Sequence, residues 1–264
     1  MHSPRSETRA ALVRRPGPLL AQGLLTHIER TPVDAALARM QWAGYVDALR
    51  QAGWNAIEVP TADDCPDAVF IEDQVVVFES LAVLCLSGAP SRRPEVVSIA
   101  PVLKELGYRV ERIELPGTVD GGDILKVGMT VYVGLTFRTN AEGVRQLTDL
   151  VAPHGYNVVG VPTHTVLHLK SAVTALPDGT VIGYPPLVDD ATAFQSFRAV
   201  PEEGGAHVVL LGEGRLLMSS SAPQSAALFT QLGYTPVCVD ISEFEKLEGC
   251  VTCLSVRLRA LPAL

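Results

Sequence analysis

The chain has 264 residues, 47% of them hydrophobic, and its formal net charge is -8 at pH 7. That length and apolar content predict one or two compact globular domains with a real core, and the chain is too long for a small disulfide scaffold. The acidic balance argues against nucleic acid as a partner.

The cysteines and the N-terminal segment bear on where the protein works. Five cysteines is an odd number, so we expect reduced thiols in a cytoplasmic protein. The first 20 residues carry arginines but no apolar core of signal-peptide length, and we predict a mobile tail over residues 1–8. No apolar run approaches the roughly 18 residues of a membrane span, so we expect a soluble protein with no membrane partner.

In chain order, the predicted elements repeat about every 50 residues. Each copy reads as the end of an amphipathic helix, a glycine cap followed by an aromatic residue, and a short strand. A degenerate copy at residues 194–201 has lost its glycine. The caps are Gly53, Gly107, Gly155 and Gly233, and the strands are expected at residues 57–60, 113–116, 158–162 and 237–240.

A pair of apolar runs that resembles a β-hairpin follows each copy. The predicted pairs are residues 74–78 with 82–86, 124–127 with 130–133, 172–176 with 181–184, and 208–211 with 216–218. The fifth pair would join the two ends of the chain, residues 254–258 with 10–14. The pattern therefore predicts a unit of strand, hairpin and helix that repeats about five times around a central axis, as one domain over residues 1–264.

The unusual polar motifs all follow the strand at the same position of the unit. Because a ring of repeats brings equivalent loops together, we expect these side chains to converge at the axis. Glu72 and Asp73 lie between apolar runs, and buried carboxylates without partners are costly, so a function is the favoured reason for them. The convergent residues are Asp67, Glu72, Asp73, Asp120, His168 and Cys253.

Cys250 and Cys253 form a Cys-x-x-Cys motif between a charged helical segment, residues 242–246, and a short apolar strand. Buried structural thiols, a redox pair and half a zinc site all compete with a catalytic role. A thioredoxin-type pair opens a helix, which this pair does not, and the other cysteines are too scattered to complete a zinc site. We interpret Cys253 as a nucleophile and expect Cys250→Ser to be nearly silent.

A thiol, a histidine and carboxylates in one pocket indicate covalent catalysis on a cationic carbon. Cys253 would attack as a thiolate, and His168 would protonate the leaving group and then deprotonate water. A guanidinium group fits, because its N–H donors match carboxylates.

Each site residue also has a plainer reading. The Asp120-Gly-Gly-Asp123 motif could be a simple turn, His168 a core histidine, and Arg92 and Arg138 surface arginines. The sequence leaves these alternatives open.

Six motifs together resemble the dimethylarginine dimethylaminohydrolase family, within a guanidine-modifying superfamily that includes arginine deiminases and amidinotransferases. The resemblance covers nearly the whole chain and implies a five-bladed α/β propeller with pseudo-five-fold symmetry. The motifs are Pro66-Asp67-Ala-Val-Phe70-Ile-Glu72-Asp73, Gly88-Ala-Pro-Ser-Arg92-Arg93, Asp120-Gly-Gly-Asp123, Gly134-Leu-Thr-Phe-Arg138-Thr-Asn140, Leu167-His168-Leu-Lys170-Ser171 and Thr252-Cys253-Leu-Ser255.

The resemblance implies hydrolysis of dimethylarginine and monomethylarginine to citrulline and an alkylamine, through a thiouronium intermediate on Cys253. Arg92 and Arg138 would bind the substrate carboxylate, a task that suits the arginine fork. The remaining implied roles are Cys253 as nucleophile, His168 as general acid and base, Asp120 as its orienting carboxylate, Asp67, Glu72 and Asp73 as ligands of the guanidinium, and the carbonyls of Leu24 and Leu247 as ligands of the amine.

Two other functions stay open at this point. One is an arginine deiminase-like or other guanidino-acid hydrolase. The motif in arginine deiminases looks like His-x-Asp, whereas this chain has Lys170 at the position of the aspartate, and a lysine there favours a methylated substrate. The other is a non-catalytic module that binds guanidinium or zinc. We expect no cofactor, zinc only as an inhibitor at Cys253 and His168, and a small-molecule partner. The sequence leaves the oligomeric state open, with a homodimer as one option.

Overall fold

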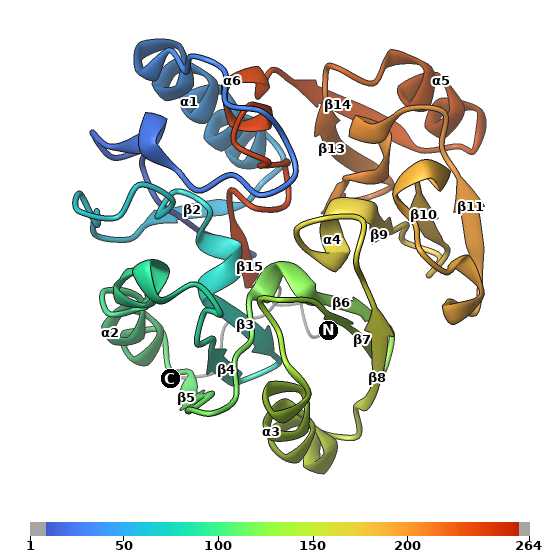
Figure 1. Ribbon diagram of the computed structural model, residues 1–264. Helices are drawn as coiled ribbons and strands as arrows, with labels where there is room; N and C mark the ends of the chain where they lie inside the picture. Colours follow the sequence, from blue (N-terminus) through green and yellow to red (C-terminus); the bar gives the residue numbers. More distant parts are fainter. Residues whose placement is uncertain (1–8, 259–264) are drawn as a thin grey trace, which may run out of the picture.

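The computed structural model describes residues 9–258, and within them five three-stranded sheets follow one another around a common centre (Figure 1). In each sheet the middle strand has an antiparallel neighbour on one side and a parallel one on the other. The sheets, with the middle strand second, are β15 (Val256–Leu258), β1 (Ala10–Val13) and β2 (Asn55–Glu58); β3 (Val75–Phe78), β4 (Leu81–Leu84) and β5 (Arg109–Arg112); β6 (Ile124–Val127), β7 (Thr130–Leu135) and β8 (Asn157–Pro162); β9 (Val173–Ala175), β10 (Val181–Gly183) and β11 (Phe197–Ala199); and β12 (Val209–Gly212), β13 (Arg215–Ser219) and β14 (Thr235–Val239).

Helices connect the second and third strands of four sheets and lie on the outside of the molecule (Figure 1). They are α1 (Ala35–Gln51), α2 (Ile99–Glu105), α3 (Ala141–Val151) and α5 (Pro223–Gln231). The β10–β11 connection instead uses two short 3-10 turns, Pro185–Leu187 and Ala191–Ala193, in the copy that lacks the glycine cap. Two further helices, α4 (Leu169–Ala172) and α6 (Ser242–Glu245), are single turns.

All five predicted strand pairs are confirmed, including the pair split between distant parts of the chain, where Ala10 lies opposite Leu258. The third strand of each sheet joins the preceding hairpin. The elements follow one another along the chain in the predicted order, but each strand belongs to the hairpin before it and not to the hairpin after it. The repeating unit is therefore hairpin, helix and strand, where the sequence pattern predicts strand, hairpin and helix. The predicted tail, residues 1–8, lies outside the described residues.

One predicted strand is wrong. The strand of the second unit is Arg109–Arg112, not residues 113–116, and it pairs in parallel with β4 from Leu81 to Leu84. This edge strand is rich in charge, with an ion pair between Arg109 and Glu111, and charged edges protect a sheet from further pairing. The apolar signal lay instead on Ile113, a buried residue that follows the strand.

The glycine caps have the conformation that their role requires. Gly53, Gly107, Gly155 and Gly233 all have φ near +85°. At three of them the next N–H bonds back to a carbonyl of the helix, as Tyr234 N does to Phe229 O at 3.0 Å. This is the hydrogen bond of a Schellman motif, and it fixes the angle at which the chain leaves the helix for the third strand.

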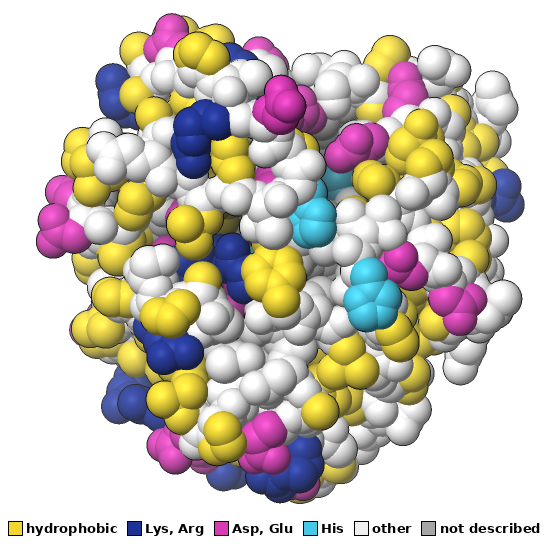
Figure 2. Space-filling view, in the orientation of Figure 1, with side chains coloured by type: hydrophobic (Ala, Val, Ile, Leu, Met, Phe, Trp, Pro, Cys, Tyr) yellow, Lys and Arg dark blue, Asp and Glu magenta, His cyan; other side chains and the backbone are white. Residues whose placement is uncertain are grey.

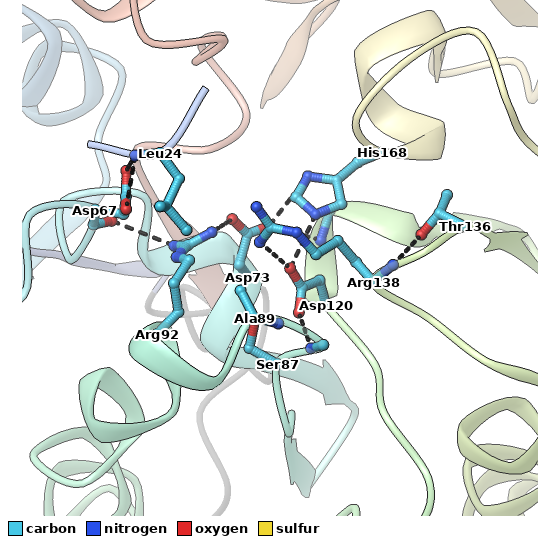
Figure 3. Close-up of polar contacts among 12 residues, drawn as sticks. Leu24, Asp67, Asp73, Ser87, Ala89, Arg92, Asp120, Thr136, Arg138 and His168 are labelled. Carbon is cyan, nitrogen blue, oxygen red and sulfur yellow. Dashed lines mark hydrogen bonds and ion pairs between the residues drawn. The ribbon is translucent and has the colours of Figure 1, made fainter. Parts of the chain in front are cut away.

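Five apolar clusters fill the spaces between the sheets and their helices, and each cluster contains residues from more than one unit. Several buried charged residues meet in the space between the sheets, among them Asp73, Arg92, Asp120, Arg138 and His168 (Figure 3). The apolar layer therefore surrounds a polar interior. Within residues 9–258, no helix is long and apolar enough to cross a membrane.

Gly233→Ala should lower the free energy of unfolding by about 1–2 kcal/mol, because an L-residue is strained at this φ. No atom lies within 4 Å of the added Cβ, so the loss measures the backbone alone. Gly44→Ala is the matched control: its Cβ also meets no atom within 4 Å, but it lies inside α1, and it should stabilise the fold by about 1 kcal/mol. Urea unfolding measures both changes, and the same sign for both would contradict this account.

Candidate active site

The segments that carry Asp73, Asp120, His168 and Cys253 each precede the first strand of a hairpin, and this shared position brings their side chains together. Figure 3 shows the first three. Asp73 lies in the 3-10 turn before β3, Asp120 before the turn that leads into β6, His168 before α4 and β9, and Cys253 before β15. One narrow pocket is lined by eight of the residues predicted from the sequence: Leu24, Asp67, Asp73, Arg92, Arg138, His168, Leu247 and Cys253.

Asp120 lies behind His168 and bonds to it. Its Oδ2 is 3.0 Å from His168 Nε2, and it also accepts from Arg138 Nη1 at 3.1 Å. Burial opposes a charged imidazole, but Asp73, Asp123 and Asp120 outweigh it and raise the pKa of His168 to about 9. The imidazole is therefore protonated at neutral pH and can act as an acid.

The glycines of the Asp120-Gly-Gly-Asp123 motif allow this close approach. A Cβ on Gly122 would lie 2.6 Å from both Asp73 Oδ1 and His168 Nδ1, and a Cβ on Gly121 would collide with the Glu72 carbonyl oxygen. Gly122 N also donates to Asp73 Oδ1 at 2.9 Å. The motif is thus a turn, but one whose glycines let two acidic side chains and an imidazole meet.

The sequence analysis gave no role to Asp123, which is fully buried. Its carboxylate accepts from the N–H of Leu169 at 2.9 Å, directly after His168, and from Thr136 and Thr139. Burial raises the pKa of Asp123 to about 6, against the opposing effects of His168 and of the hydrogen bonds from Thr139 and Leu169 N. Asp123 therefore fixes the start of α4 and with it the direction of the imidazole. Its place as the second aspartate of a four-residue motif was the signal that could have identified it.

Arg92 and Arg138 are only 4% and 3% exposed, so the reading of both as surface arginines is wrong. Arg92 Nη1 donates to Asp73 Oδ2 at 2.7 Å, and its other nitrogens bond to Glu95, a buried carboxylate that the sequence analysis did not consider. Each guanidinium thus has a carboxylate partner while it lines the pocket.

A loop that contains Leu24 covers one side of the pocket. Leu24 N donates to both oxygens of Asp67, at 3.1 and 3.2 Å, and Glu248 holds the following Thr26 and His27 N–H groups at 2.7 Å. Burial raises the pKa of Asp67, against the opposing effect of Arg92. Two carboxylates therefore hold the loop in place.

Glu72 is placed differently from its neighbour Asp73. Its Oε1 pairs with Lys170 Nζ at 2.6 Å and with Arg257 Nη2 at 2.8 Å, and all three side chains line a separate cavity. Glu72 and Lys170 are absent from the lining of the pocket that contains Cys253. The structure therefore does not bring Glu72 together with the other predicted guanidinium ligands.

Cys253 has a second thiol beside it. Its Sγ lies 3.3 Å from Cys250 Sγ. The hydrogen bond to Cys250, burial, and the negative charges of Glu72 and Asp73 all raise the pKa of Cys253. The thiol is therefore protonated at neutral pH, and a further cation placed beside it, in addition to those that line the pocket, would be needed to ionise it.

Asp73, Asp120 and His168 could supply three metal ligands, because their donor atoms lie within 4.8 Å of one another. However, Arg92 pairs with Asp73 and Arg138 with Asp120, and these cations oppose the binding of a metal ion.

The chain was compared with known proteins. It is 59% identical, over 254 residues, to N(G),N(G)-dimethylarginine dimethylaminohydrolase of Streptomyces coelicolor, and the match spans 96% of this chain and 98% of that one. The chain belongs to the dimethylarginine dimethylaminohydrolase family. The protein of that name from Pseudomonas aeruginosa is 35% identical over 93% of this chain and 98% of its own length. No protein-family model matches.

A solved dimethylarginine dimethylaminohydrolase structure has the same fold. A variant of the Pseudomonas aeruginosa protein in complex with citrulline superposes with a TM-score of 0.88 at 32% identity, and covers 96% of this chain and 100% of that one. The α/β fold predicted from the sequence is thus confirmed.

The imidazole of His168 should titrate near pH 9 in the free protein, and histidine NMR would follow it. This pKa lies above the value of about 6.5 that histidine has in an unfolded chain. The charged imidazole therefore stabilises the fold fully below about pH 6.5, and this stabilisation is lost as the pH rises through 9. Asp120→Asn should lower the pKa, whereas Asp149→Asn, a change to an exposed residue on α3, should not. Equal pKa values in the two variants would show that Asp120 does not set this charge.

Proposed function

We propose that this protein hydrolyses Nω,Nω-dimethyl-L-arginine and Nω-monomethyl-L-arginine to L-citrulline and dimethylamine or methylamine. The 59% identity to a dimethylarginine dimethylaminohydrolase across 96% of the chain carries the proposal. The pocket supports it, since it holds a thiol, a cationic imidazole, carboxylates and two arginines within one narrow space.

Substrate binding would use the charges that line the pocket. Asp73 and Asp67 would take the guanidinium, and Arg92 and Arg138 the α-carboxylate, which their forked donors suit. The carbonyls of Leu24 and Leu247 would accept from the amine. A bound guanidinium also lowers the pKa of Cys253, whose proton then leaves to solvent, so the nucleophile forms where the substrate is present.

The first half of the reaction breaks the C–N bond. The Cys253 thiolate attacks the guanidinium carbon, and a C–S bond forms. His168 is cationic in the free protein, and it donates its proton to the departing amine nitrogen as the C–N bond breaks. A thiouronium on Cys253 and a neutral imidazole held by Asp120 remain.

The second half regenerates the enzyme. His168, now neutral, accepts a proton from water as the water oxygen attacks the same carbon. The C–S bond then breaks, the departing Cys253 sulfur takes up the remaining hydroxyl proton and becomes the thiol again, and neutral citrulline carries the new oxygen. Asp120 stabilises each return of charge to the imidazole, and Asp123 positions the ring through Leu169 N.

We also propose that the fold is a five-bladed propeller with pseudo-five-fold symmetry and that it forms a single catalytic domain. Five sheets of the same strand arrangement support this description. The five cysteines are unpaired, which is consistent with a reducing cytoplasm. The partner would be the small methylated arginine alone, with no cofactor.

The decisive test of the reaction measures dimethylamine and citrulline from dimethylarginine, with arginine assayed beside it. Wild type should form both products, and Cys253→Ser should lose at least about 10⁴-fold in kcat, since a covalent nucleophile is removed. Cys238→Ser, which changes an exposed thiol, is the control and should keep full activity. Ammonia from arginine as the main product would keep the mechanism but reject the substrate, and no turnover of either would favour the binding module.

A second test separates Asp73 from Glu72. Asp73→Asn should lower kcat/KM for dimethylarginine by about 100-fold, because it removes a charged guanidinium ligand. Glu72→Gln should instead lower the free energy of unfolding by about 3 kcal/mol, since Lys170 and Arg257 lose their buried partner, with less than about tenfold change in kcat/KM. If Glu72→Gln instead lost as much kcat/KM at unchanged stability, Glu72 would be a substrate ligand after all.

A further inference from the structure

Cys250 has no part in the reaction as described above, yet its thiol lies against the nucleophile. The two Sγ atoms are 3.3 Å apart, and Cys250 Sγ is also 3.2 Å from Thr252 Oγ1. Both thiols are buried. An S–S bond is about 2.05 Å long, so the sulfur atoms need to approach by little more than 1 Å.

The backbone already has a shape that admits such a bond. Cys253 N donates to Cys250 O at 3.1 Å, which closes a four-residue turn. A turn of this kind holds its end Cα atoms within about 7 Å, close to the range found in disulfides. Closure therefore needs side-chain rotation and little movement of the chain.

The two thiols face different pockets. Cys253 lines the narrow pocket with Asp73 and His168, whereas Cys250 lines a neighbouring cavity of about 590 Å³. Figure 2 shows this face of the molecule hollowed near its centre, between α4, α6 and β13, with histidine side chains around the hollow. A small polar oxidant can therefore reach Cys250 by a path that the substrate does not occupy.

The surroundings also make the two thiols unequal. The hydrogen bond from Cys253 lowers the pKa of Cys250, which burial opposes, and His207 in the same cavity acts in the lowering direction. The same hydrogen bond, together with burial and the charge of Asp73, raises the pKa of Cys253. Thiolates, not thiols, react with peroxides, so Cys250 is the first to be oxidised in the free protein.

We propose that Cys250 is a peroxide-sensitive modification site, and that its oxidation joins it to Cys253 in a reversible disulfide that removes the nucleophile. The proposal rests on the proposed function for its effect on activity, but the disulfide itself does not depend on it.

The chemistry is complete with hydrogen peroxide as oxidant. The Cys250 thiolate attacks one peroxide oxygen, an S–O bond forms, the O–O bond breaks, and the departing hydroxide takes a proton to become water. Cys253 then attacks the sulfenic sulfur, an S–S bond forms, the S–O bond breaks, and a second water leaves. Two thiols lose two electrons and two protons, and one peroxide becomes two waters.

The test treats the whole protein with a few equivalents of hydrogen peroxide, alkylates the free thiols and digests with trypsin. Cleavage after Lys246 and Arg257 releases residues 247–257, which contain both cysteines and no other. This peptide should lose two hydrogens and take up no alkyl group. Turnover of dimethylarginine should fall at least tenfold in step with that mass change and return with dithiothreitol.

Two variants, each compared with its own untreated activity, complete the design. Cys238→Ser lacks the exposed thiol and should form the same disulfide as wild type. Cys250→Ser lacks the thiol that reacts first, and burial, Glu72 and Asp73 still raise the pKa of Cys253. After the same peroxide treatment its peptide should therefore take up one alkyl group at Cys253, and its turnover should stay at the untreated level.

Two results would overturn the proposal. One is a wild-type peptide that takes two alkyl groups after peroxide treatment. The other is a peptide with oxygen added to Cys253 while Cys250 is alkylated. A protein with no turnover before oxidation would instead reject the proposed function, and the mass of the peptide would still decide whether the disulfide forms.

Discussion

A single buried carboxylate, that of Asp120, holds two cations at the centre of this protein. It is 0% exposed, and His168 and Arg138 both donate to its Oδ2. A buried charge is costly unless it is paired, so this arrangement is stable only while the loops hold all three groups in place. The same constraint applies to the Arg92 and Asp73 pair beside it. The glycines that let these loops approach one another are therefore as necessary as the charges.

The repeat explains why such an interior can exist. The apolar side chains of the five units pack between sheets and outer helices, and they form a rigid surrounding layer. Four of the five units then send a loop inward before the first strand of the hairpin. Two of these loops contribute carboxylates, a third an imidazole and a fourth a thiol. Equivalent backbone positions carry unrelated side chains, which is how a repetitive fold acquires an asymmetric pocket.

Sequence reasoning predicted the strands and their pairing because hairpins and glycine caps are local patterns. It placed β5 wrongly because a charged edge strand carries no apolar signal. It could not separate Asp73 from Glu72, since adjacent residues can face opposite cavities and only the tertiary packing decides which one faces the site. The burial of Arg92 and Arg138 was hidden for the same reason: both lie in polar segments whose partners come from other parts of the chain. The 3.3 Å approach of Cys250 Sγ to Cys253 Sγ could not be predicted either, because it depends on the turn between the two residues.

The sheet that contains β1 and β15 differs from the other four in the order in which it can form. The other sheets join strands that are near one another in the sequence, whereas this one pairs Ala10 with Leu258. Closing so long a loop has a large entropic cost, which falls once the intervening sheets have brought the two strands close. Cys253 directly precedes β15, so the position of the nucleophile depends on the pairing of β15 with β1. Partly folded chains would then carry carboxylates and an imidazole but no working thiol, and activity would report on the last step of assembly.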